Sequence, residues 1–141
     1  MAERNLAQVL LAAEIGDQAD LEELSEAADR AFQRLSLELA TLVTTVGSQA
    51  LFARALHLTR LEFPFLAGIR IGSPPDTCLG GLRESIRGVE PTRASDGLVA
   101  LLAVLIGLLT TFIGEDLTLR LLSAAWPETV LAHMSLERQE A

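Results

Sequence analysis

Apolar side chains recur along most of this chain at steps of three and four residues, the spacing that gathers them on one face of a helix. One such stripe lies within residues 20–46 and a second within residues 93–125, and each predicts a long helix. Shorter patterns of the same kind predict further helices over 4–15, 49–62, 82–87 and 128–137.

Glycine, proline and serine mark the expected ends of these helices. Gly47-Ser48 has the form of a C-cap followed by an N-cap, so a break is predicted there. Residues 63–80 are rich in Gly and Pro and are predicted to form a loop. Gly114 is predicted to bend the second long helix without ending it, because the apolar stripe continues in helical phase beyond it.

The stretch 97–114 is the most apolar part of the chain. It carries no charge, and its only polar side chains are Thr110 and Thr111. It therefore needs cover from other helices, from lipid or from another subunit. Its 18 residues are close to the minimum for a single membrane span, which requires about 20. A bundle core is favoured because the stripe continues past Gly114 and no Trp or Tyr belt flanks the segment, so membrane attachment is the less favoured alternative.

Composition supports a helical fold. Half of the residues are hydrophobic, while aromatic residues make up only 4% and Tyr is absent. Helix formers therefore outnumber strand formers, and 141 residues suffice for one substantial core. We expect one all-α domain over residues 1–141, a compact bundle of five to six helices.

Charge narrows the range of partners. The net charge is −8, and residues 1–47 hold nine acidic residues against three Arg. Such a chain repels phosphate backbones, so no nucleic acid is expected as a partner. The single Cys78 cannot form an internal disulfide, and the N-terminal segment is a poor signal peptide, so a cytoplasmic location is expected.

Two segments resemble each other. Residues 39–56 (LATLVTTVGSQALFARAL) match residues 105–122 (LIGLLTTFIGEDLTLRLL) at seven positions without gaps, four of them Leu. A duplication would predict two long helices related by a pseudo-twofold axis, with the Thr-Thr pairs near their crossing. Shared helical composition is the favoured explanation, because the chain is rich in Leu.

The residues for catalysis or metal binding are sparse. The chain has two His and one Cys, far apart, without the spacings of a zinc or di-iron site, so no metal or cofactor is expected. No pair of residues has the spacing of a nucleophile and its base, and the chain is not expected to be an enzyme. Cys78, just before Gly80-Gly81, is a candidate reactive thiol, although a packing role is favoured.

Two groups of charged residues are the candidate sites. Glu115, Asp116 and Arg120 follow the apolar stretch, and Asp116 with Arg120 forms an i,i+4 pair. A buried ion pair that fixes helix register is the favoured interpretation, and a ligand or interaction site is the alternative. The second group is a basic strip formed by Arg54, His57 and Arg60 at steps of three residues. It is expected to bind at most a weak anion or a partner.

Taken together, these features favour a non-enzymatic helical interaction or scaffold module that associates with a second copy or another protein through exposed parts of its long helices. Two alternatives come from other classes. One is a bundle that binds an apolar ligand or lipid, which requires a cavity along residues 98–113. The other is a membrane-associated protein with a single span at 97–114.

Overall fold

The computed structural model describes residues 3–15, 20–72 and 78–140, with side chains up to residue 133. The helices are α1 (Glu3–Glu14), α2 (Leu21–Leu39), α3 (Thr45–Thr59), α4 (Leu82–Ile86), α5 (Pro91–Ile113), α6 (Glu115–Ala125) and α7 (Pro127–Glu140). A 3-10 helix, η1 (Pro64–Gly68), and a short ribbon of β1 (Arg70–Ile71) and β2 (Leu79–Gly80) complete the described elements. The all-α prediction is confirmed, with seven α-helices among the described residues instead of five or six.

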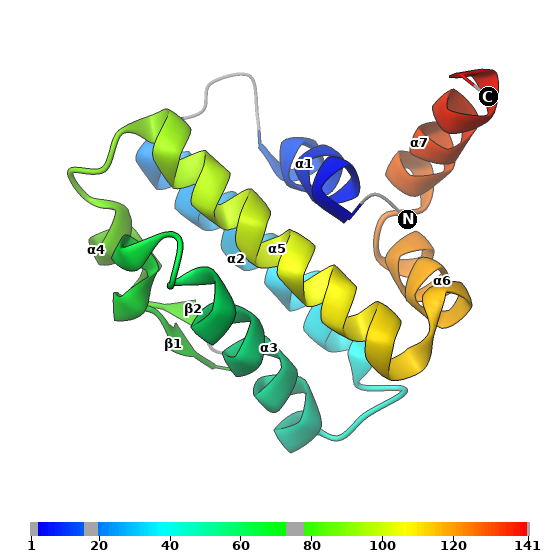
Figure 1. The fold of residues 1–141 in the computed structure, drawn as a ribbon, viewed down its shortest axis with the longest axis horizontal. Helices are drawn as coiled ribbons and strands as arrows, with labels where there is room; N and C mark the ends of the chain where they lie inside the picture. Colours follow the sequence, from blue (N-terminus) through cyan, green and yellow to red (C-terminus); the bar gives the residue numbers. More distant parts are fainter. Residues whose placement is uncertain (1–2, 16–19, 73–77, 141) are drawn as a thin grey trace.

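Helix α5 is the centre of the bundle. Figure 1 shows it crossing the molecule with α1 on one side, α3 on the other and α2 behind it. Its apolar residues from Ala94 to Leu109 supply much of the core. Pro91 occupies the first helical turn, where the missing N–H costs no hydrogen bond. The apolar stretch 97–114 is thus wrapped by helices of the same chain over much of its surface.

Helix α5 also has the composition of a membrane span. Among the described residues it is the one helix long and apolar enough to cross a bilayer, with a mean hydropathy of 2.3 over its most apolar window. Half of that window is already buried against neighbouring helices. The core helix of a water-soluble protein can have this same composition, because the faces that pack against its neighbours are apolar.

The first predicted long helix is wrong in its extent. Helix α2 ends at Leu39, and α3 starts at Thr45. The Thr44 hydroxyl accepts a hydrogen bond from the Gly47 amide at 3.0 Å, which makes Thr44 the N-cap of α3. The physical reason is local. Residues 41–46 (TLVTTV) are mostly β-branched, which lowers their helix propensity, and Thr44 among them can act as the N-cap of a new helix.

The second predicted long helix is also interrupted. Gly114 has φ +90° and ψ 160°, a conformation that is essentially restricted to glycine, and it ends α5 instead of bending it. The chain then restarts as α6. The Gly114 carbonyl oxygen accepts the first backbone hydrogen bond of α6 from the Thr118 amide at 3.1 Å, and the Thr118 hydroxyl donates to the same oxygen at 2.8 Å.

The settings of the two Thr-Thr pairs differ. Thr44 caps the start of α3, whereas Thr110 and Thr111 lie in the last turn of α5 and donate to carbonyls four residues earlier. Neither long helix is continuous, so the predicted crossing of two long helices is not formed. These contexts favour shared composition over duplication as the source of the similarity.

The segment predicted as a loop carries short regular elements. In the antiparallel ribbon Arg70 lies opposite Gly80, and Ile71 lies opposite Leu79. The Asp29 carboxylate of α2 accepts a hydrogen bond from the Leu79 amide at 3.0 Å and ties the ribbon to the bundle. The ribbon thereby lies beside α2 and α3.

A buried carboxylate joins three parts of the fold. The Glu14 side chain, at the end of α1, is only 6% exposed. It accepts hydrogen bonds from the Trp126 indole at 2.9 Å and from Arg30 at 3.2 Å, and it forms an ion pair with Arg34. Helix α1 is therefore tied to α2 and to the junction between α6 and α7.

Candidate functional sites

A small polar pocket lies between α2, α3 and the ribbon. Its volume is about 170 Å³. The lining residues are Ser36, Leu37, Ala40, Thr45, Ser48, Gln49, Phe52 and Gly72. None of them is charged, so the pocket combines hydroxyl and carboxamide groups with an apolar floor and rim.

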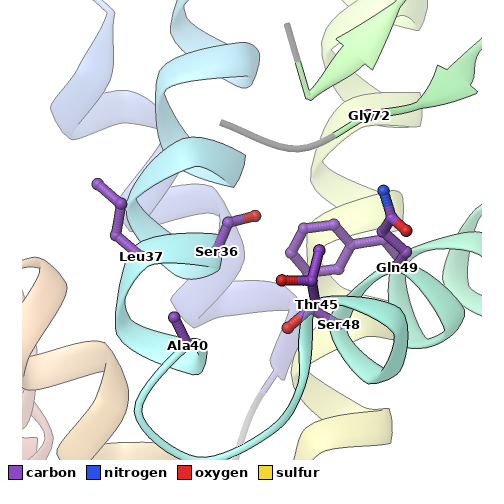
Figure 2. Close-up of a pocket in the computed structure, with 8 residues that line it drawn as sticks. Ser36, Leu37, Ala40, Thr45, Ser48, Gln49 and Gly72 are labelled. Atoms are coloured by element: carbon purple, nitrogen blue, oxygen red, sulfur yellow. The ribbon is translucent and has the colours of Figure 1, made fainter. Parts of the chain in front are cut away.

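The early start of α3 builds this pocket. Because Thr44 is the N-cap, the first turn of α3 presents Thr45, Ser48 and Gln49 toward the end of α2. Figure 2 shows the Ser36 side chain extending from α2 toward α3, while Gln49 extends toward Gly72. Had α2 continued to residue 46, these side chains would have had a different orientation and the pocket would not exist.

Ser36 is hydrogen-bonded to Cys78, but three other polar side chains of this pocket have no partner among the described residues. The Ser48 residue is 7% exposed. The side chains of Thr45, Ser48 and Gln49 form no hydrogen bond with any described residue. No sealed polar side-chain atom in the described part of the chain lacks a partner, so the Ser48 hydroxyl must open into the pocket. An exposed hydroxyl would bond to bulk water, but one this buried depends on whatever occupies the pocket.

Cys78 lies behind the pocket and is fully buried. Its Sγ is 3.9 Å from the Ser36 hydroxyl. Burial raises the pKa of the Cys78 thiol; the hydrogen bond with Ser36 partly opposes this shift, and the charge of Asp29 adds to it. A buried thiol with a raised pKa stays protonated at neutral pH, so this geometry favours the packing role over the reactive one.

The predicted buried ion pair is wrong. The structure places Glu115, Asp116 and Arg120 in α6 with all three side chains exposed. No ion pair joins them within 4.0 Å in the described structure, although Asp116 and Arg120 are four residues apart in one helix. The interruption at Gly114 explains the error, because it rotates α6 away from the stripe of α5.

The basic strip is formed only in part. Arg54, His57 and Arg60 are all exposed on α3 or at its C-cap. The guanidinium of Arg60 lies 3.1 Å from His57 Nδ1. A weak anion or partner site on this strip stays a prediction.

Large apolar side chains are exposed beside both helix interruptions. Four exposed apolar residues lie close in sequence to the two helix interruptions, and together we call them the apolar end: Leu42, Val46, Phe112 and Leu117. Figure 1 shows that the α2–α3 connection and the α5–α6 turn lie at the same end of the molecule. The Val46 and Phe112 side chains are 76% and 64% exposed. Leu42, Val46 and Leu117 belong to the predicted core stripes, and they are exposed because the helices are interrupted beside them. Phe112 lies outside those stripes, in the last turn of α5.

Sequence reasoning missed both the pocket and the apolar end. The sequence signal that could have revealed them is Thr44, which lies within a run of β-branched residues and is of a type favoured at helix N-caps. Among the described residues no group of three His, Cys, Asp or Glu could hold a metal ion. Comparison with protein-family models, curated proteins and solved structures finds no match to this chain. Function is therefore inferred from the geometry alone.

Proposed function

We propose that this protein is a non-enzymatic helical interaction module that self-associates through its apolar end. The observation that carries the proposal is the exposure of large apolar side chains, Phe112 above all, at the two helix interruptions. Large apolar groups gathered at one place on a surface mark contact sites in soluble proteins. Aromatic residues contribute strongly to such contacts.

The charges beside this surface favour a second copy as the occupant. Glu115 and Asp116 lie next to Phe112 in the chain, and Arg120 lies one turn further along α6. They are exposed, and no described residue forms an ion pair with them. In a twofold interface each contact occurs twice, so the acids of one copy can face the Arg of the other on both sides. The surface is thus complementary to itself in charge as well as in hydrophobicity.

The first test is the double substitution Val46→Asp with Phe112→Asp. The wild type is expected to dimerise in the micromolar range, and the variant to dissociate more than about tenfold more readily, because burial of each side chain contributes about 1.5–3 kcal/mol. Light scattering after size exclusion and sedimentation equilibrium measure this.

A matched control carries the same charge change elsewhere. Leu61 and Leu131 are exposed to a similar degree, 73% and 68%. The double variant Leu61→Asp with Leu131→Asp should dimerise as the wild type does. A wild type that stays monomeric throughout, or a control that weakens as much as the test variant, would contradict the proposal.

The charge arrangement has its own test. Arg120→Asp should weaken the dimer roughly two- to fivefold, since exposed ion pairs contribute about 0.2–1 kcal/mol each. Adding Asp116→Arg to the same chain should restore most of the loss. A double variant that dimerises more weakly than the single one would show that the acids and Arg120 do not face each other.

A further inference from the structure

We infer that the pocket between α2 and α3 binds a small neutral molecule that carries a carboxamide or a similar donor–acceptor edge. This inference does not rest on the proposed self-association, because the pocket contains no residue of the apolar end.

The chemistry of the lining selects a neutral ligand. None of the described lining residues has a charged side chain that could compensate an ionic ligand. An ion in such a site would lose its water without gaining an opposite charge, which is strongly unfavourable. A neutral ligand loses much less hydration on entry.

The same lining selects a polar edge on that ligand. Gln49 offers one acceptor and one donor side by side, the complement of another carboxamide, and the Ser48 and Thr45 hydroxyls can donate or accept as needed. Ser48 is a buried residue whose hydroxyl has no partner among the described residues, so it can bond only to water or to a ligand in the pocket. A purely apolar occupant would leave it unpaired.

The size of the pocket limits the ligand to about one ring. An engineered apolar cavity of roughly 150 Å³ in another protein accepts benzene. The volume here is about 170 Å³, which suits a single ring or a short chain bearing an amide. Phe52 and Leu37 are the large apolar residues of the lining that such a ring or chain can contact.

Three probes of nearly equal shape separate the possibilities: benzamide, benzoate and toluene. Each is titrated into the isotope-labelled full chain while amide and Gln49 side-chain signals are followed by two-dimensional NMR. We expect benzamide to shift signals of Ser36 and of residues 45–49 with millimolar affinity, as suits so small a ligand. Benzoate and toluene should bind at least about tenfold more weakly, since one brings an unpaired charge and the other leaves polar groups unpaired.

Two variants assign the effect to the pocket. Gln49→Leu keeps a similar side-chain volume but removes the carboxamide, and it should weaken benzamide binding at least about tenfold. Ser48→Ala, a smaller change, should weaken it by a lesser factor. The control Gln8→Leu makes the same replacement at an exposed position of α1 and should leave binding unchanged. The dispersion of the NMR spectra shows that each variant is folded.

Three outcomes overturn the inference. Absence of shifts with all three probes means that the pocket holds only water. Equal binding of toluene and benzamide means that the polar groups do not select the ligand. Equal binding of benzoate means that neutrality is not required. None of these outcomes depends on whether the chain dimerises.

Discussion

Glu14 illustrates how much of this fold depends on single side chains. Its buried carboxylate receives the Trp126 indole N–H and two Arg side chains, so α1, α2 and the α6–α7 junction share one acceptor. The two Arg side chains are about half exposed and can return to water, whereas Trp126 is buried. The unsatisfied indole is therefore the main consequence of losing the carboxylate.

Replacing Glu14 with Ala is expected to lower the free energy of unfolding by about 1–3 kcal/mol, because a buried donor loses its acceptor. Urea denaturation followed by circular dichroism measures the change. Glu22→Ala is the matched control, since Glu22 pairs with Arg83 where both side chains are exposed. That variant should change stability by about 0.5 kcal/mol or less. Equal losses in the two variants would contradict the structural role assigned to Glu14.

Cys78 allows a clean pH experiment. The chain contains no Lys and no Tyr, so Cys78 is the only side chain expected to titrate between about pH 8 and 11. Its pKa is raised in the fold above the ordinary value of 9.0. The unfolded state therefore releases this proton at lower pH than the native state does, and stability falls as pH rises from about 9 through the folded pKa.

We expect the urea midpoint of the wild type to decline over that pH range and the midpoint of Cys78→Ala to stay nearly level. The variant will be less stable at every pH, because it leaves a small void at a buried position. The slopes, not the absolute stabilities, are compared. Parallel slopes would show that the thiol does not carry the alkaline dependence.

At the scale of the element, the interruption at Gly114 is the decisive feature. A side chain at Gly114 would be strained in a conformation that other residues seldom adopt, so Gly114→Ala should cost about 1–3 kcal/mol. Gly107 lies within α5, where an added methyl group meets nothing within 4 Å. Gly107→Ala should therefore stabilise the protein by up to about 1 kcal/mol through helix propensity. Thermal and urea unfolding measure the two opposite signs, and a destabilised Gly107→Ala would indicate cover on that face.

The positions of the helices could be predicted from the sequence better than their ends. Apolar spacing identified the helical segments and the central role of residues 97–114, because burial of that stretch is a matter of composition. It failed at residues 40–46 and at Gly114, where an apolar residue continues the stripe although the backbone has already turned. The spacing of apolar residues indicates which face of a helix would be buried. It does not indicate where that helix ends. The pocket depended on that second question and was therefore out of reach.

For the whole molecule, the packing of α5 in the bundle bears on whether the chain binds a membrane. Moving α5 into lipid would separate it from α1 and α3 and expose their apolar faces to water. We expect the purified chain to remain in the supernatant when phosphatidylcholine vesicles are pelleted. A sample without vesicles controls for aggregation. Recovery of the chain in the vesicle pellet alone would favour membrane attachment.

The packing of α1 on α5 has a consequence for synthesis. The buried face of α1 contacts α5, which follows it only after α2, α3 and α4. Helix α1 also contacts α2, but in a chain made from its N-terminus the part of its apolar face that packs on α5 stays uncovered until most of the sequence has emerged. Such distant closure is slow compared with the formation of each helix, and the nascent chain is exposed to aggregation in the interval. Helix α5, the centre of the native bundle, is thus not yet made during most of the time in which α1 is already exposed to solvent.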